Sequence, residues 1–399
     1  MAGAAGPGPL LRRGPRPLLL HLTLAMLRSS GSVAASMPWN AASPRSTEAA
    51  AIRAALAGQA DAFPQAVLEE ALRQDRALIA GIAAYRRHPF RRDLPDPPAL
   101  WTEGETRLLD FGGTGPTVLF VPSLVNRAHV LDLAPGHSML RWLAAEGMRP
   151  LLLDWGWPGE VERSFTLTDY IAGRLERALA AAPGRVVLAG YCMGGLLTLA
   201  AAQRRPERVA ALALLATPWD FHAADAAQAA TVGRLRPLLE PLMTASGALP
   251  VDALQVLFAL LDPFGVSAKY RSFASLDPTS ARAGLFVALE DWLNDGIPLA
   301  APVARECLEG WYGANTPARG TWRVAGLPVD PGAIRMPSFV AVPTRDRIVP
   351  PESARPLAAA ITGATLLEPG AGHIGMAAGS TAERALWRPF REWVAGLPA

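Results

Sequence analysis

The chain has 399 residues, half of them hydrophobic, which is enough for one large α/β domain with insertions or for two domains. The net charge is only +3 and no basic cluster contains interleaved aromatic residues, so a nucleic-acid partner is not expected. The two cysteines, Cys192 and Cys307, are too few for a disulfide framework or a zinc site, and a reducing cytoplasm suits a reactive thiol.

Residues 1–47 are predicted to be a flexible segment that contains one apolar stretch. Arginines precede the apolar run 17–27 and small residues follow it, as in a secretory signal peptide. His21 and Thr23 interrupt the run and Arg28 ends it, so secretion is not expected, and a surface or membrane-contacting helix is the competing interpretation. No apolar run approaches the length of about 20 residues that a membrane-spanning helix needs.

Residues 48–100 are predicted to form an N-terminal helical region, because apolar side chains recur there at helical spacing. From 101 to 219 the first part of an α/β core is expected. Strands are predicted over 106–111, 117–121, 149–155, 185–189 and 209–215, and helices over 138–146, 167–182 and 196–204. The first two strands look like partners. Alternating strands and helices predict a mostly parallel sheet with right-handed crossovers.

The alternation stops near residue 220 and resumes near residue 334. Residues 220–333 are helical and broken by prolines, and we expect them to form a cap inserted before the strand that carries the acid. Residues 334–399 are expected to complete the core, with strands over 337–343 and 364–368 and helices over 353–361 and 382–397.

The stretch Val187–Leu196 has the pattern of a nucleophile elbow, G-x-S-x-G, with Cys192 in the place of serine. An apolar strand leads into it and a helix follows. The glycines at positions 190, 194 and 195 lack side chains, so strand and helix are able to approach closely around a strained nucleophile. The alternative is a small free cysteine packed under a helix.

A cysteine nucleophile needs a base, and the base needs a third group to orient it. His222 and His373 are the histidines that follow Cys192, and His222 falls at the start of the predicted cap. His373 lies in a glycine-rich loop between the last strand and the last helix, which is where α/β-hydrolases carry their base. The sequence therefore predicts His373 as the base.

Asp346 is the predicted acid, because it lies on a turn directly after the strand 337–343. Asp330 is a weaker rival, since it precedes that strand. The alternative for Asp346 is a solvated aspartate paired with Arg345 or Arg347.

Two backbone N–H groups are expected to form an oxyanion hole for the reacting carbonyl. One belongs to Met193, and the other to Leu124 or Val125 in the loop 122–126. A thiol nucleophile that attacks a thioester keeps the acyl group activated, so Cys192 favours acyl transfer over ester hydrolysis, although cysteine hydrolases also exist on this fold.

Three residues of the predicted cap are candidates for contact with the substrate: Trp292, Asn294 and Asp295. The structural alternative is a buried tryptophan followed by a turn. No metal ligands are predicted.

Several motifs together resemble the polyhydroxyalkanoate synthases. They are VLFVPSLVNRAHVLDL at 118–133, GYCMGG at 190–195, DWLND at 291–295, the segment 320–330, DRIVP at 346–350 and GHI at 372–374. The resemblance implies an α/β-hydrolase fold, a Cys192–Asp346–His373 triad and growth of a polyester from 3-hydroxyacyl coenzyme A (CoA) thioesters. It implies no further cofactor, a homodimer or a second synthase subunit, and attachment to storage granules in the cytoplasm.

The sequence departs from the family at Arg347, at Pro351 and over 375–379. The first alternative is therefore a cysteine hydrolase of the same fold, namely a polyester depolymerase, an esterase or a thioesterase. The second alternative is a non-catalytic protein of the granule surface that docks through its apolar N-terminal segment.

Overall fold

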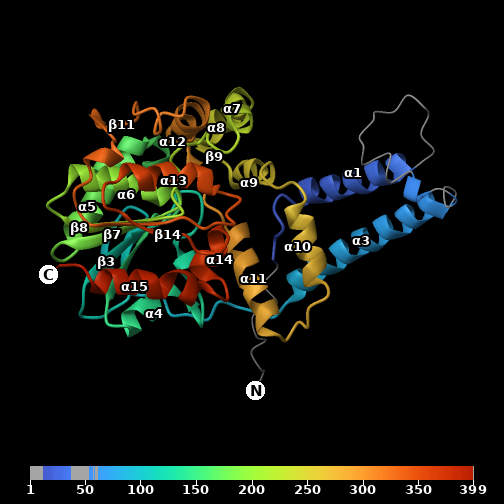
Figure 1. Ribbon diagram of the computed structural model, residues 1–399, viewed down its shortest axis with the longest axis horizontal. Helices are drawn as coiled ribbons and strands as arrows, with labels where there is room; N and C mark the ends of the chain where they lie inside the picture. Colours follow the sequence, from blue (N-terminus) through green and yellow to red (C-terminus); the bar gives the residue numbers. More distant parts are fainter. Residues whose placement is uncertain (1–11, 37–53, 57, 59–61, 399) are drawn as a thin grey trace, which may run out of the picture. The chain divides into compact units, whose positions relative to one another are not determined.

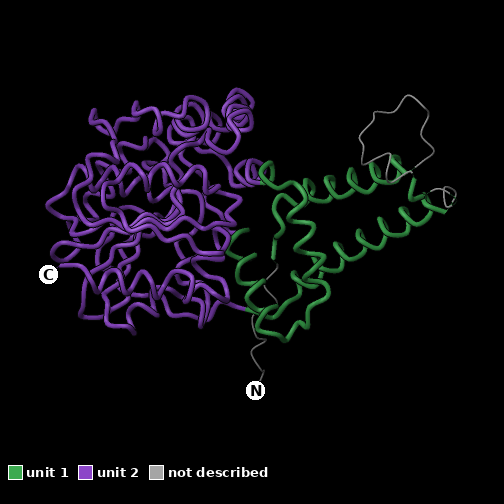
Figure 2. Tube along the Cα trace, in the orientation of Figure 1, with its two compact units in different colours: residues 1–90, 259–294 green, residues 91–258, 295–399 purple. Residues whose placement is uncertain are grey.

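The computed structural model describes residues 12–36, 54–56, 58 and 62–398. The chain divides into two compact units, which Figure 2 shows in different colours. Unit 1 comprises residues 1–90 and 259–294, and unit 2 comprises residues 91–258 and 295–399. Each unit has a hydrophobic core of its own.

Unit 1 is helical. Its long helices are α1 (Leu18–Ser36), α3 (Ala62–Arg87), α10 (Gly265–Phe273) and α11 (Ala281–Asn294). Tyr85 of α3 and Phe286 of α11 both meet the ring of Tyr270 edge-on, at centroid distances of 5.6 and 5.5 Å. Gly81 lets α3 and α10 touch, because a side chain there would overlap the Tyr270 carbonyl.

A charged anchor ties the start of the described chain to α11. Asp291 accepts hydrogen bonds from Arg12 at 2.7 Å and from the Tyr85 hydroxyl at 2.8 Å. The other guanidinium nitrogens of Arg12 donate to the carbonyls of His88 and Phe90. Burial raises the pKa of Asp291 and these donors oppose the shift, so Arg12 compensates a carboxylate that α11 holds largely away from water.

Two predictions for the N-terminal segment were wrong: residues 18–36 are not flexible, and their helix is long enough for a membrane span. Residues 18–36 form a helix, because Leu18, Leu22 and Ala25 pack on the core of unit 1. This helix is 19 residues long, little buried, and apolar enough by length and composition to cross a membrane, a test that soluble core helices and signal sequences also pass. The prediction that no apolar stretch is long enough failed because it counted only the run 17–27, whereas the small residues that follow extend the helix to Ser36. Residues 12–17, which precede this helix, are also described, whereas residues 1–11 and 37–47 lie outside the described residues.

Unit 2 is built on an eight-stranded sheet with the order β1-β2-β6-β3-β7-β8-β13-β14. The strands are β1 (Ala99–Glu103), β2 (Thr106–Asp110), β3 (Thr117–Val121), β6 (Arg149–Asp154), β7 (Val186–Tyr191), β8 (Val209–Leu215), β13 (Ser338–Ala341) and β14 (Thr365–Leu367). All pairs from β6 to β14 are parallel, and the pairs β1–β2 and β2–β6 are antiparallel. The predicted mostly parallel sheet is confirmed.

The predicted pairing of the first two core strands was wrong. β2 pairs with β1 and β6, whereas β3 lies between β6 and β7. From Val118 to Val121 every side chain of β3 is buried, and such a strand needs covered faces and a neighbour on both sides. β1 was not predicted, because it is short, largely exposed and follows a proline-rich stretch.

Helices cover both faces of this sheet (Figure 1). Those of the core are α4 (Met139–Ala145), α5 (Glu176–Ala181), α6 (Met193–Arg204), α13 (Pro351–Ala360), α14 (His373–Ala378) and α15 (Arg388–Ala395), with π-helical turns over Asp169–Leu175 and Glu383–Trp387. In Figure 1, α5, α6 and α13 lie on one face, and α4 and α15 lie on the other.

The segment predicted as one cap is divided between the two units. Its parts in unit 2 include α7 (Ala226–Arg234), α8 (Arg236–Ser246), β9 (Ala248–Leu249), β10 (Leu299–Ala300), α12 (Ala301–Arg305) and a π-helix over Glu306–Gly313; α9 (Val251–Ala259) ends at the boundary. Residues 259–294 group with the N-terminal helices, because α10 and α11 share a hydrophobic core with α1 and α3. The expected cap boundaries at 220 and 333 therefore differ from the boundaries of the compact units.

Candidate active site

Cys192 lies between β7 and α6 in a strained backbone conformation. Its φ of 57° and ψ of −130° are outside the regions that residues with side chains commonly adopt. Such a conformation costs about 1–3 kcal/mol and persists only where the surroundings impose it. Here the Cys192 N–H donates to Leu215 O at 2.8 Å and the Cys192 carbonyl accepts from Gly195 N at 2.9 Å.

The glycines around Cys192 are required by close approaches of the backbone. A side chain at Gly190 would overlap the Cα of Gly195, and one at Gly194 would lie only 2.7 Å from the Pro122 carbonyl. At Gly195 an added Cβ would lie 2.7 Å from the Cβ of Thr217. The predicted tight contact between strand and helix is therefore present, and the first residues of the loop after β3 are part of it.

Asp346 and His373 form a buried hydrogen-bonded pair. The Asp346 Oδ2 lies 2.6 Å from the His373 Nδ1, and the other carboxylate oxygen accepts the N–H groups of Ile348 at 2.8 Å and Val349 at 2.9 Å. A carboxylate with both oxygens engaged in this way only accepts, so Nδ1 carries a proton and the Nε2 side of the ring is free for another partner.

His373 also interacts with the Cys192 side chain. Burial alone would lower the pKa of the imidazole, but the negative charges of Cys192 and Asp346 and the hydrogen bonds to both raise it to about 10. The imidazolium form is therefore favoured at neutral pH when it faces a thiolate. The structure thus brings together all three residues predicted for the chemistry, and Cys192 is partly accessible to solvent.

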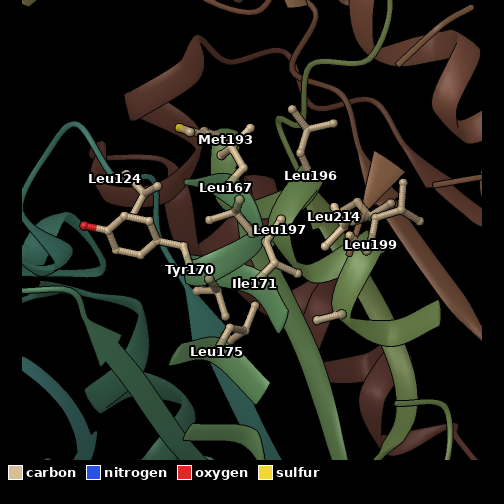
Figure 3. Close-up of a cluster of buried hydrophobic side chains, with 14 of the residues drawn as sticks. Leu124, Leu167, Tyr170, Ile171, Leu175, Met193, Leu196, Leu197, Leu199 and Leu214 are labelled. Atoms are coloured by element: carbon tan, nitrogen blue, oxygen red, sulfur yellow. The ribbon is translucent and has the colours of Figure 1, made fainter. Parts of the chain in front are cut away.

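The predicted oxyanion-hole residues lie around the same point. Met193 is the first residue of α6, where the backbone N–H has no acceptor within the helix. Leu124 is buried, and Figure 3 shows it in the same hydrophobic cluster as Met193. Val125 is half-buried, and its carbonyl accepts the N–H of Ile297 at 3.1 Å.

The rival candidates have other roles. Asp330 accepts the N–H of Gly332 at 2.8 Å and caps a short helical turn, so it is not the partner of a histidine. His222 lies 2.7 Å, through Nε2, from the Tyr312 carbonyl. Cys307 is buried in the π-helix with Trp311, and burial raises the pKa of its thiol.

Trp292, Asn294 and Asp295, the three candidates for substrate contact, lie in different surroundings. Trp292 is buried in α11. Asn294 accepts the Arg16 N–H at 2.8 Å and donates to Glu290 O at 2.6 Å, so its amide holds the N-terminal segment within unit 1. Asp295 is exposed and belongs to unit 2.

Aromatic residues beside Cys192 were not found from the sequence. The Tyr191 hydroxyl donates to the His373 carbonyl at 3.1 Å, and the two rings lie 5.2 Å apart. Phe221 packs on the same cluster as Cys192 and meets Tyr312 edge-on at 5.0 Å. Burial, and then the charge of Cys192, raises the pKa of Tyr312. In the sequence, only Tyr191, directly before Cys192, indicated that aromatic side chains surround the nucleophile.

No group of three or more His, Cys, Asp or Glu side chains within the described ranges is arranged to hold a metal ion. The chemistry that the site offers is that of a thiol, an imidazole, a carboxylate and backbone N–H groups.

Comparison with known families agrees with the fold. Residues 116–233 match the family model described as "alpha/beta hydrolase fold". The chain has the α/β-hydrolase fold. The bromoperoxidase from Bacillus anthracis covers 73% of this chain and 95% of its own at 15% identity, with a TM-score of 0.49. The thioesterase domain from the curacin biosynthetic pathway matches at 18% identity, covering 70% of this chain and 93% of its own, with a TM-score of 0.44.

Curated proteins similar to this chain include poly(3-hydroxyalkanoate) polymerase subunits. The subunit PhaC of Haloferax mediterranei is 29% identical over 74% of this chain and 63% of its own length. Those of Haloarcula marismortui and Allochromatium vinosum are each 28% identical over 69% of this chain, and over 60% and 80% of their own lengths. The predicted resemblance to the polyhydroxyalkanoate synthases is confirmed. The chain matches about three fifths of the length of the two archaeal relatives.

Proposed function

We propose that this chain is an acyltransferase that moves 3-hydroxyacyl groups from CoA thioesters onto a growing polyester. The observation that carries the proposal is Cys192 at a strained elbow, close enough to the hydrogen-bonded His373–Asp346 pair to raise the pKa of His373, in a chain whose relatives are named poly(3-hydroxyalkanoate) polymerases. These three residues are proposed as the catalytic residues.

In the first step the Cys192 thiolate attacks the thioester carbonyl, and the thiol proton rests on His373. The carbonyl oxygen gains negative charge, which the N–H groups of Met193 and of the loop 122–126 would stabilise. The C–S bond to CoA then breaks, the proton on His373 passes to the departing sulfur, and the acyl group remains on Cys192 as a thioester.

In the second step His373 takes the proton of a hydroxyl group, whose oxygen attacks the acyl-Cys192 carbonyl. An oxygen ester forms and the Cys192 sulfur leaves as thiolate. Asp346 accepts the Nδ1 proton of His373 in a hydrogen bond throughout, which orients the ring and stabilises its charged form. Because thioester is exchanged for thioester in the first step, the acyl group stays activated for this transfer.

The proposal includes partners and location. The names of the relatives contain the word "subunit", which supports either a second synthase subunit or a homodimer as the working form. We propose that the protein works in the cytoplasm at the surface of polyester granules, that it needs no cofactor beyond its CoA thioester substrate, and that it has no nucleic-acid partner.

The test is to incubate the full-length protein with 3-hydroxybutyryl-CoA and to follow both free thiol and polymer. We expect CoA release with polyester formation, no activity in Cys192→Ala, and undiminished activity in Cys307→Ala as the matched control. CoA release that yields only free 3-hydroxybutyrate would overturn polymer synthesis and indicate a thioesterase. Activity retained in Cys192→Ala would overturn the proposed nucleophile.

A further inference from the structure

The loop after β3 is clamped by a segment far along the chain. Asn126 forms an antiparallel β-bridge with Gly296, and the Ile297 N–H donates to the Val125 carbonyl at 3.1 Å. All these residues lie within unit 2. We call the contact of Gly296 and Ile297 with this loop the clamp. The loop begins at Pro122, which closely approaches Gly194 at the start of α6, two residues after Cys192.

The hydrogen bond to Val125 fixes the orientation of a peptide group. In a trans peptide the carbonyl and the following N–H point in opposite directions. Since the Val125 carbonyl points toward Ile297, the Asn126 N–H points away from the clamping segment. Releasing this bond would let this peptide rotate and would remove one restraint on the preceding peptides of the loop, which carry the N–H groups of Val125 and Leu124.

The side-chain oxygen of Asn126 does not add to this connection. The Asn126 Oδ1 is buried, and among the described residues it has no hydrogen-bond partner. The connection at Asn126 is therefore made by the backbone, while the start of the loop is held by Trp155 Nε1, which donates to the Pro122 carbonyl at 3.1 Å.

The clamping segment is itself held from its other side. Its continuation, β10, pairs with β9 through Leu299–Leu249 and Ala300–Ala248. A Cβ added to Gly296 would lie 3.0 Å from Val251 Cγ1 and 3.5 Å from the Val125 carbonyl oxygen. The φ of Gly296 is outside the left-handed region, so crowding against Val251, and not backbone strain, disfavours a side chain here.

We propose that Gly296 and Ile297 are positioning residues. They hold the loop 122–126 so that one of its backbone N–H groups donates a hydrogen bond to the oxyanion that forms while Cys192 is acylated. This inference rests on the proposed function. It predicts that a displaced clamp slows acylation of Cys192 without lowering the reactivity of the thiol itself.

The test compares two reactions of the same sulfur. Acylation by 3-hydroxybutyryl-CoA or a nitrophenyl ester forms an oxyanion, whereas alkylation by iodoacetamide does not. In Gly296→Ala we expect the rate of acylation, followed by mass shift, to fall about three- to tenfold, since the new methyl group crowds Val251 Cγ1 at 3.0 Å and a displacement of a full ångström costs up to about a hundredfold. The alkylation rate and the substrate KM are expected to change by less than twofold.

Two further variants separate positioning from general damage. Gly173→Ala is the matched control, because an added Cβ there meets only the flexible end of Arg177 at 3.5 Å. Val251→Ala combined with Gly296→Ala removes the atom that crowds the new methyl group, and we expect it to recover most of the acylation rate. Unfolding midpoints of all variants show that the protein is folded.

The outcomes distinguish the two proposals. If Gly296→Ala acylates at the wild-type rate, or if acylation and alkylation fall in the same proportion, the positioning role is overturned and the proposed function stands. If the wild-type Cys192 is alkylated but is not acylated by any of these substrates, the proposed function itself is overturned, and the positioning role with it.

Discussion

The His373 Nδ1 lies 2.6 Å from the Asp346 Oδ2, and this contact joins the turn after β13 to the first residue of α14, 27 residues further along the sequence. The carboxylate is not free to turn away, because the N–H groups of Ile348 and Val349 hold its other oxygen. Asp346 therefore presents a fixed acceptor to one nitrogen of the ring, and the other nitrogen is left to face the nucleophile.

Asp346→Asn is expected to lower kcat by about 10²–10⁴-fold, because the neutral amide neither stabilises the imidazolium nor secures the same ring tautomer. CoA release from 3-hydroxybutyryl-CoA measures the effect. Asp330→Asn is the matched control, since that aspartate only caps a turn, and its kcat should match wild type. A wild-type kcat in Asp346→Asn would show that His373 works without this partner.

The pKa of His373 provides a second prediction. Its imidazole should hold its proton until the pH rises through about 10, and loss of the Cys192 charge in Cys192→Ala should lower that pKa toward the ordinary value of 6.5. The sign follows from the charges, because a neighbouring anion favours the imidazolium and its removal favours the neutral ring. Titration of the ring carbons by NMR measures the shift, with the other histidines as internal controls.

The same shift connects pH to stability. A histidine whose folded pKa is raised contributes stability that is fully present below its unfolded pKa of about 6.5. That contribution is lost as the pH rises through about 10. An unchanged His373 pKa in Cys192→Ala would mean that the thiolate does not contribute to the shift.

Local patterns in the sequence predicted the elbow and the two loops, because each depends on residues close together in the chain. The glycines around Cys192 mark a place where strand and helix approach closely, whereas an added side chain at Gly370, Gly372 or Gly375 near His373 would meet nothing closer than 3.5 Å. Asp346 follows the carboxyl end of β13, and that end marks the side of the sheet on which the site lies. Since parallel strands end at the same edge, the order of the motifs was enough to predict that the three residues meet.

The parts that failed depend on packing between distant segments. Nothing local to β2 or β3 shows that β6 separates them. The grouping of α10 and α11 with the N-terminal helices depends on shared burial of Tyr85, Tyr270 and Phe273, which no spacing within either segment reveals. The clamp at Gly296 is likewise a contact between loops about 170 residues apart, and a lone glycine carries no signal of it.

Gly194→Ala is expected to destabilise unit 2. The new methyl group would lie 2.7 Å from the Pro122 carbonyl and would overlap the carbonyl of Val121, and neither backbone group is able to swing aside as a side chain does. Overpacking of this kind costs about 1–3 kcal/mol, occasionally more. Urea unfolding measures the loss, with Gly173→Ala as the control. An unchanged midpoint would show that the loop after β3 yields easily.

The apolar surface of α1 should contribute to granule binding. Leu19, Met26 and Leu27 are 77%, 66% and 64% exposed, so their replacement by serine should not unfold unit 1. Co-sedimentation with isolated polyester granules should fall at least about tenfold, since one buried side chain of this size contributes about 1.5–3 kcal/mol. Leu238→Ser is the control, because this residue of α8 is 74% exposed. Equal loss in both variants would remove α1 as the docking helix.

Cys192→Ser tests why the nucleophile is a thiol. A serine acylated by a thioester would hold the acyl group as an oxygen ester, which is a poorer donor to the next hydroxyl. We expect slow acylation followed by still slower transfer, so that an acyl-enzyme accumulates and appears as a mass shift at residue 192. Cys307→Ser should behave like wild type in the same assay, because that thiol is buried and burial raises its pKa. Sustained polymer synthesis by Cys192→Ser at the wild-type rate would contradict the role of the thioester intermediate, and rapid release of free hydroxy acid would instead show that the serine enzyme admits water to its acyl group.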